Sequence, residues 1–128
     1  MRPLIFVPLL LLFTSSLIAA PLDPAVRAEI DALLSSLEKS GCEFNRNGSW
    51  YSAAKAKAHL LLKLDYLEGK NAVRSTEQFI DLGAATSSVS GKPYLVRCGN
   101  AAPIESKKWL TTRLAALRSS GRAASSPK

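Results

Sequence analysis

The sequence predicts a small, mainly α-helical single domain of about four helices, with a short strand or hairpin and one disulfide. Apolar residues recur every three or four positions in several segments of the 128-residue chain, a spacing typical of amphipathic helices. Short stretches rich in glycine, asparagine and serine separate these segments. The chain has two cysteines, and an N-terminus of the exported type precedes them.

The N-terminal segment has the layout of a secretory signal peptide. A positive charge at Arg2 precedes an apolar run over residues 4–13, and the small residues Ala19 and Ala20 follow. The run is shorter than the roughly 20 residues that a membrane-spanning helix needs. We therefore expect a signal peptide over residues 1–19, cleaved after Ala19 or Ala20. The mature chain would be periplasmic or secreted, with no transmembrane span.

The cysteines Cys42 and Cys98 are expected to form a disulfide in an oxidising compartment. Closing a loop of this length stabilises a domain by roughly 4 kcal/mol. Two buried free thiols are the alternative. No cysteine or histidine pair has metal-ligand spacing, so we predict neither a metal nor a cofactor.

The first mature helix is predicted over residues 24–40. Asp23 is a good N-cap, Pro24 suits the first helical position, and Gly41 is well placed to end the helix. The apolar face of this helix is formed by Val26, Ile30, Leu33, Leu34 and Leu37.

A turn and a second helix are predicted next. Asn47 and Gly48 readily adopt positive φ and favour a sharp reversal. Apolar residues including Tyr51 then recur at helical spacing, so we expect a helix over residues 49–67, with Gly69 at its end.

A short third helix is expected to begin near Ser75, where Gln78 completes a capping box. Its expected core residues are Phe79, Ile80 and Leu82. A serine-rich loop over residues 86–93 follows, and residues 94–98 resemble a short strand. Residues 43–44 are the one partner that this strand could find, once the disulfide forms.

The last helix is predicted over residues 104–117. A single domain would thus occupy residues 20–118, followed by a disordered basic tail over residues 119–128.

The net charge of +7 is concentrated near the C-terminus. From residue 107 onward there is no acid, and the basic residues are Lys107, Lys108, Arg113, Arg118, Arg122 and Lys128. A basic tail that adsorbs to the anionic envelope is therefore one functional hypothesis. Aromatic residues do not alternate with these cations, so we predict no nucleic-acid partner.

Catalytic motifs are incomplete. His59 is the single histidine, so it cannot share a metal with another imidazole. Ser88 or Ser90 could pair with His59 in an envelope hydrolase, but the spacing does not require it. The alternative is a loop whose hydroxyls hydrogen-bond to their own backbone. We therefore favour a non-enzymatic role and assign no catalytic residue.

Four ordered motifs resemble the YfeK-like family of small exported proteins of Gram-negative bacteria. They are Phe-Asn-Arg-Asn-Gly at 44–48 with Tyr51, Ala-His-Leu at 58–60 with Lys63, Glu-Gln-Phe-Ile at 77–80, and a serine-rich run that ends in Gly-Lys-Pro-Tyr at 91–94. This resemblance implies an exported, periplasmic domain of unknown function. It implies no activity.

Polar residues dominate these motifs, which suggests either a hydrogen-bonded structural network or a binding site. The candidate binding residues are Arg46, Asn47, His59, Ser88, Ser90 and Lys92. The disulfide would bring their two loops to one end of the domain. The leading hypothesis is a binding or interaction module of the cell envelope, whose partner is an envelope protein or an anionic ligand. The cations would engage the anion and the polar side chains would donate hydrogen bonds. The sequence does not predict an oligomeric state.

Overall fold

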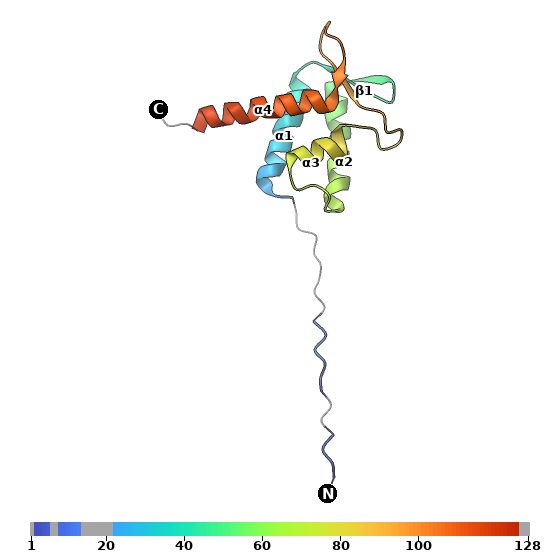
Figure 1. The fold of residues 1–128 in the computed structure, drawn as a ribbon, viewed down its shortest axis with the longest axis vertical. Coiled ribbons are helices and arrows are strands. Elements are labelled where there is room, and N and C mark those ends of the chain that lie inside the picture. The colour runs from blue at the N-terminus through green and yellow to red at the C-terminus, as the bar shows by residue number, and fades with distance from the viewer. Residues whose placement is uncertain (1, 6–7, 14–21, 126–128) are drawn as a thin grey trace.

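The computed structural model describes residues 2–5, 8–13 and 22–125, and the first helix among them is α1 (Figure 1). The elements in chain order are α1 (Pro24–Lys39), β1 (Glu43–Arg46), β2 (Ser49–Ser52), α2 (Ala53–Gly69), α3 (Thr76–Phe79), the π-helical turn η1 (Ile80–Ala84), β3 (Leu95–Arg97), β4 (Ile104–Glu105) and α4 (Ser106–Ser125).

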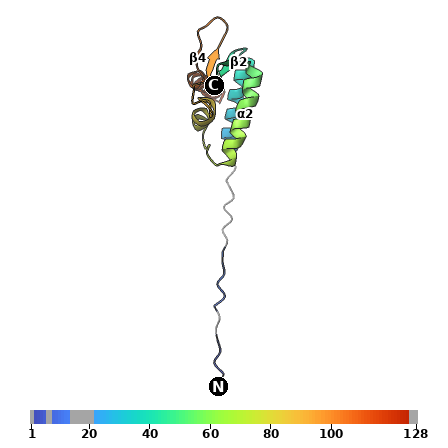
Figure 2. The ribbon, with the colours of Figure 1, turned by 90° about the vertical axis from the view of Figure 1, so that its right-hand side faces the viewer.

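The expectation of a mainly helical domain is wrong, because the helices are joined by a four-stranded antiparallel sheet of order β2-β1-β3-β4. Figure 2 shows the strands at one end of the helices. Each strand has only two to four residues. Such segments are too short for alternating apolar and polar residues to stand out in a sequence. The fold is therefore a helix-plus-sheet arrangement.

The reversal expected at Asn47 and Gly48 is confirmed. Both residues have positive φ, 53° and 83°, and they join β1 to β2 as a two-residue hairpin loop. The predicted helix start at Ser49 is wrong, because residues 49–52 form β2 and Ser52 caps α2. Tyr51 fits the helical spacing by coincidence, and periodicity alone cannot exclude a strand there.

The pairing expected between residues 43–44 and the strand that precedes Cys98 is also confirmed. Glu43 lies opposite Arg97, and Phe44 lies opposite Val96. The Cys42–Cys98 disulfide lies beside the first of these pairs, with 4.3 Å between the two Cα atoms. This crosslink joins the start of β1 to the end of β3.

The caps of the first and third helices agree with the sequence. The Asp23 side chain accepts a hydrogen bond of 2.8 Å from the Ala25 amide, and α1 begins at Pro24. The Ser75 hydroxyl accepts from the Gln78 amide at 3.1 Å, and the Gln78 side chain accepts from the Arg74 amide at 2.7 Å.

The prediction that Leu82 is a core residue of the third helix is wrong. Leu82 is 52 % exposed, whereas Phe79, Ile80 and Gly83 are buried. A Cβ atom at Gly83 would lie only 2.9 Å from the Phe79 ring, so the chain packs there without a side chain. Leu82 and Gly83 both lie in the π-helical turn η1. This turn departs from the 3.6-residue period of an α-helix, on which the prediction of core-facing residues was based.

The core lies between α1, α2, η1, α4 and the inner face of the sheet. Its largest fully buried side chains are Tyr94, Phe44, Phe79, Ile30, Leu33, Leu34, Leu37, Leu60, Leu64, Ile80, Leu110 and Val96. Figure 2 shows α1 and α2 side by side, and α4 packs against α1 and η1.

Helix α4 is longer than predicted, since it runs from Ser106 to Ser125. Residues 119–125, where we expected a disordered tail, are helical, and residues 126–128 lie outside the described part of the chain. In Figure 1 the C-terminal end of α4 projects beyond the other helices.

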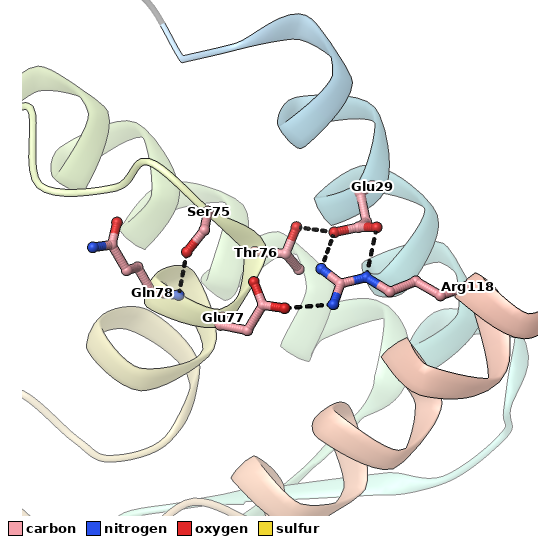
Figure 3. A network of polar contacts seen from close by, with 6 residues as sticks. All are labelled: Glu29, Ser75, Thr76, Glu77, Gln78 and Arg118. Atoms are coloured by element: carbon pink, nitrogen blue, oxygen red, sulfur yellow. Dashed lines mark hydrogen bonds and ion pairs between the residues drawn. The ribbon is translucent and has the colours of Figure 1, made fainter.

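An ionic network joins α1, α3 and α4 (Figure 3). The Arg118 guanidinium donates two hydrogen bonds to Glu29, at 3.1 and 2.8 Å, and another to Glu77. The Thr76 hydroxyl donates to the same Glu29 carboxylate at 2.6 Å. These hydrogen bonds lower the pKa of Glu29 and, through Arg118, that of Glu77. The sequence had indicated Arg118 only as part of the C-terminal basic cluster.

The predicted signal peptide is only partly covered. Residues 8–13 of the apolar run are described without helix or strand, and the cleavage positions Ala19 and Ala20 lie outside the described residues. No helix in the described part of the chain is both long enough and apolar enough to cross a membrane.

Replacing both cysteines by serine should lower the free energy of unfolding by about 4 kcal/mol, because the 56-residue separation leaves a long loop unclosed in the unfolded chain. Urea denaturation measures this difference. A reductant should lower the unfolding free energy of the native protein by the same amount as the double substitution does. It should leave the unfolding free energy of the double variant unchanged. A loss below about 1 kcal/mol would show that the sheet register does not need the crosslink.

Arg118→Ala should lower the unfolding free energy at neutral pH by about 1 kcal/mol, since the network is multidentate but partly exposed. Because the pKa values of Glu29 and Glu77 are lowered in the folded state, their contribution is complete above about pH 4.5. It disappears as the pH falls through the folded values. Denaturation at pH 7 and at about pH 2.5 tests this, with Arg74→Ala at an exposed position as control. An equal loss at both pH values would contradict the ionic explanation.

Candidate functional site

A pocket of about 370 Å³ lies between α2, the β1–β2 turn and the serine-rich loop. We call it the basic pocket. Its lining residues are Arg46, Asn47, His59, Leu62, Lys63, Tyr66, Ser87, Ser88, Val89 and Tyr94. No aspartate or glutamate is among these lining residues.

Helix α2 supplies one wall of the basic pocket. His59, Leu62, Lys63 and Tyr66 have the spacing i, i+3, i+4 and i+7, which places them on one face of a helix. Leu60 and Leu64 each follow one of these residues directly and lie about 100° further round α2, where they are buried in the core. The packing of the core therefore fixes the direction in which the four pocket residues point.

Arg46 enters the pocket from the last position of β1. It lies two residues after the buried Phe44, so both side chains project from the same face of the sheet. Its Nη1 atom lies 2.8 Å from His59 Nδ1, and its Cζ atom lies 5.1 Å from the centroid of the Tyr51 ring. The guanidinium thus lies between Tyr51 of β2 and His59 of α2.

Tyr94 forms the back of the pocket and is only 2 % exposed. Its ring centroid lies 5.1 Å from that of Phe44, and its backbone N–H donates to the Ala85 carbonyl at 2.9 Å. Its hydroxyl lies 3.3 Å from His59 Nε2 and 3.1 Å from Lys63 Nζ. A core side chain therefore presents its polar end to the pocket.

Arg46 and Tyr94 both lie within hydrogen-bond distance of the His59 ring nitrogens. Arginine can only donate, so the neutral ring accepts from Arg46, whose Nη1 atom lies 2.8 Å from Nδ1 and 3.2 Å from Nε2. The Tyr94 hydroxyl lies 3.3 Å from Nε2, and its oxygen accepts from Lys63 at 3.1 Å. Arg46, His59, Tyr94 and Lys63 form a polar row in which hydrogen-bond donors predominate.

The charge of this row is positive and is not balanced by nearby carboxylates. Arg27, Arg97 and Arg118 each form an ion pair with an acid, but within the described residues neither Arg46 nor Lys63 does. Lys63 instead donates to the Thr86 carbonyl at 3.2 Å. Burial, and secondarily the charges of Arg46 and Lys63, lower the pKa of His59, which keeps the ring neutral near pH 7.

The serine-rich loop closes the other side of the pocket. The buried Ser87 hydroxyl accepts from the amides of Val89 and Ser90, at 3.2 and 3.3 Å. The Ser90 hydroxyl donates to Asn47 Oδ1 at 2.6 Å and so ties the loop to the hairpin turn. These bonds leave the Asn47 amide N–H groups and the exposed Ser88 hydroxyl as further donors at the rim.

Four of the six predicted binding residues, Arg46, Asn47, His59 and Ser88, line the basic pocket. Ser90 supports it through Asn47, whereas Lys92 is exposed and does not line it. The residues that the sequence analysis did not assign to the site are Leu62, Lys63, Tyr66, Ser87, Val89 and Tyr94. The helical spacing of Leu62, Lys63 and Tyr66 from His59 was a signal that could have found three of them.

The Ser–His pair of the hydrolase hypothesis is not formed by hydrogen bonding. Among the described contacts, the partners of His59 are Arg46 and Tyr94, and neither Ser88 nor Ser90 bonds to the imidazole. The described residues also contain no group of three or more histidine, cysteine or acidic side chains arranged to hold a metal ion.

A second, smaller pocket of about 170 Å³ lies on the other side of the Arg46–His59 pair. Tyr51 and Lys55 contribute to its lining, together with Phe44 and Ala56. The adjacent Arg46 guanidinium lowers the pKa of the Tyr51 hydroxyl because it favours the phenolate. Arg46 therefore contributes positive potential to both pockets.

Replacing His59 by glutamine should change how stability depends on pH. Because the folded pKa of His59 is lowered, the unfolded chain takes up the proton first, and the native protein loses stability as the pH falls below about 6.5. Between pH 7.5 and 5.5 the native protein should lose up to about 1 kcal/mol relative to His59→Gln, a limit set by the partial exposure of the ring. If the two proteins differ in unfolding free energy by the same amount at pH 7.5 and at pH 5.5, the imidazole is not held neutral.

Comparison with known proteins gives a family and no activity. Residues 24–118 match the model of a "Family of unknown function (DUF5329)". The "Uncharacterized protein YfeK" of Salmonella typhimurium is 43 % identical over 68 residues, which are 52 % of this chain and 55 % of that protein. The chain thus spans about half the length of this curated relative. No solved structure matches the chain. The matched range covers every element from α1 to Arg118 of α4, and the resemblance to YfeK-like proteins is confirmed: the chain belongs to the DUF5329 family.

Proposed function

We propose that this protein is a non-enzymatic, exported binding module of the cell envelope, and that its basic pocket binds an anionic group. The observation that carries the proposal is the polar row of Arg46, His59, Tyr94 and Lys63, which presents donors and positive charge to a cavity without a lining carboxylate.

The positive charge of the pocket favours an anion over other ligands. Bringing two cations together without acids is unfavourable for the unliganded protein, and a bound carboxylate or phosphate would remove that repulsion. Hydrogen bonds between charged groups are about twice as strong as those between neutral groups. The volume of about 370 Å³ lies in the lower part of the range of small-molecule sites.

Two features support binding rather than turnover. His59 is within hydrogen-bond distance of Arg46 and Tyr94, and among the described residues no carboxylate bonds to it to orient it as a general base. The serine hydroxyls of the loop bond to Asn47 and to backbone amides instead of to the imidazole. The hydrolase alternative therefore has no observation in its favour.

Export is proposed from the N-terminal sequence and from the disulfide. The positive residue, apolar run and small residues near position 19 are typical of signal peptides. A Cys42–Cys98 bond is stable in the periplasm or outside the cell, where thiols oxidise.

Arg46→Ala should weaken the binding of inorganic phosphate at least 10-fold, as measured by NMR titration of the disulfide-bonded protein. The loss of a charged bidentate donor explains that magnitude. The melting temperature should change by less than about 2 °C, since Arg46 is only half-buried.

Lys92→Ala is the matched control, because it removes the same charge from the neighbouring loop but lies outside the pocket. It should retain the affinity of the native protein within about 2-fold. Equal weakening by both variants would indicate non-specific attraction. A large loss of stability in Arg46→Ala, without any phosphate binding by the native protein, would support a purely structural network.

A further inference from the structure

We infer that the ligand of the basic pocket is an amphipathic anion, with an acidic head group and an alkyl chain. This inference rests on the proposed anion-binding function and adds the class of ligand. The head would contact Arg46 and Lys63, and the chain would lie over Leu62, Tyr66 and Val89.

Exposed apolar side chains are concentrated at this pocket. Leu62, Tyr66 and Val89 are 69 %, 63 % and 93 % exposed. Within the described part of the chain from residue 22 onward, the other exposed large apolar side chains are Leu82 and Ile104, at 52 % and 37 %, and neither lines the pocket. Apolar side chains grouped beside a concave surface commonly mark a binding site, whereas isolated ones need no explanation.

The apolar side chains of the pocket lie beside its polar row. Along α2, Leu62 lies between His59 and Lys63, and Tyr66 lies seven residues after His59, about 10 Å along the helix axis. The Lys70 ammonium lies 5.3 Å from the centroid of the Tyr66 ring. Val89, in the serine-rich loop, lines the pocket from the opposite side. A head group bound by Arg46 and Lys63 would therefore direct a medium-length chain between α2 and the loop.

Charge complementarity selects this occupant over a neutral lipid or an apolar peptide. Neither Arg46 nor Lys63 has an acidic partner among the described residues, so a neutral occupant would bury two unpaired cations. A small hydrophilic anion would neutralise them but would leave the three apolar side chains in water. An alkyl carboxylate or alkyl phosphate would neutralise the two cations with its head group and cover the three apolar side chains with its chain.

The test compares ligands that differ in one part. Isothermal titration of the disulfide-bonded protein would use acetate, octanoate, inorganic phosphate, octyl phosphate and octanol. We expect octanoate and octyl phosphate to bind at least 30-fold more tightly than acetate and inorganic phosphate, and octanol to bind weakly. The ratio of octanoate to octyl phosphate affinity distinguishes a free fatty acid from a phosphate-bearing lipid as the natural source.

Leu62→Ser isolates the apolar contribution without disturbing the core, because the side chain is exposed. It should weaken octanoate binding about 5-fold and leave acetate binding unchanged. Leu82→Ser is the matched control, since Leu82 is also an exposed leucine but lies outside the pocket. It should leave both affinities unchanged.

Three outcomes would overturn the inference. If octanoate binds no more tightly than acetate while Arg46→Ala weakens both, the pocket binds anions but does not recognise an alkyl chain. If no anion binds, the proposed function itself fails. If Leu62→Ser abolishes a concentration-dependent dimer that octanoate does not dissociate, the apolar side chains contact a second copy of the protein.

Discussion

The pairing of β1 with β3 is the constraint on which the rest of the structure depends. It joins residues about fifty positions apart, and the Cys42–Cys98 disulfide holds the end of the pair where Glu43 meets Arg97. At the other end, β1 leads into Arg46 and the Asn47–Gly48 turn, and Tyr94 immediately precedes β3. The same register therefore brings the hairpin turn and the serine-rich loop to one side of α2.

Tyr94 transmits this constraint to the pocket. Its backbone carbonyl accepts from the Ser106 amide at 2.8 Å, which positions the start of α4, and its ring packs against Phe44. Its hydroxyl accepts from Lys63 and lies within hydrogen-bond distance of His59 Nε2. Because one buried residue contacts the start of α4, the core and the polar row, the spacing of Arg46, His59 and Lys63 is a property of the whole fold rather than of a mobile loop. This rigidity favours the preorganised recognition of one charged group.

The sequence predicted what is local and missed what depends on distant contacts. Asp23, Ser75 and the Asn47–Gly48 turn are recognisable because capping and positive φ are properties of a few adjacent residues. Strand β2 was mistaken for the first turn of α2, since four residues carry no decisive period. Four of the candidate binding residues, Arg46, Asn47, His59 and Ser88, line one pocket. Lys63 follows from its i+4 spacing to His59 on α2, whereas Tyr94 is brought to His59 only by tertiary packing. Lys92 is exposed and does not line the pocket.

The central claim is that the polar row of Arg46, His59, Tyr94 and Lys63 binds the acidic head of a ligand whose chain follows α2. A titration of the isotope-labelled, disulfide-bonded protein with octyl phosphate, followed by NMR, tests this claim residue by residue. We predict that the largest shifts fall on these four residues, including deshielding of the imidazole as the anion approaches, with smaller shifts at Leu62, Tyr66 and Val89. Shifts confined to the basic residues of α4, or spread evenly over the surface, would contradict the account.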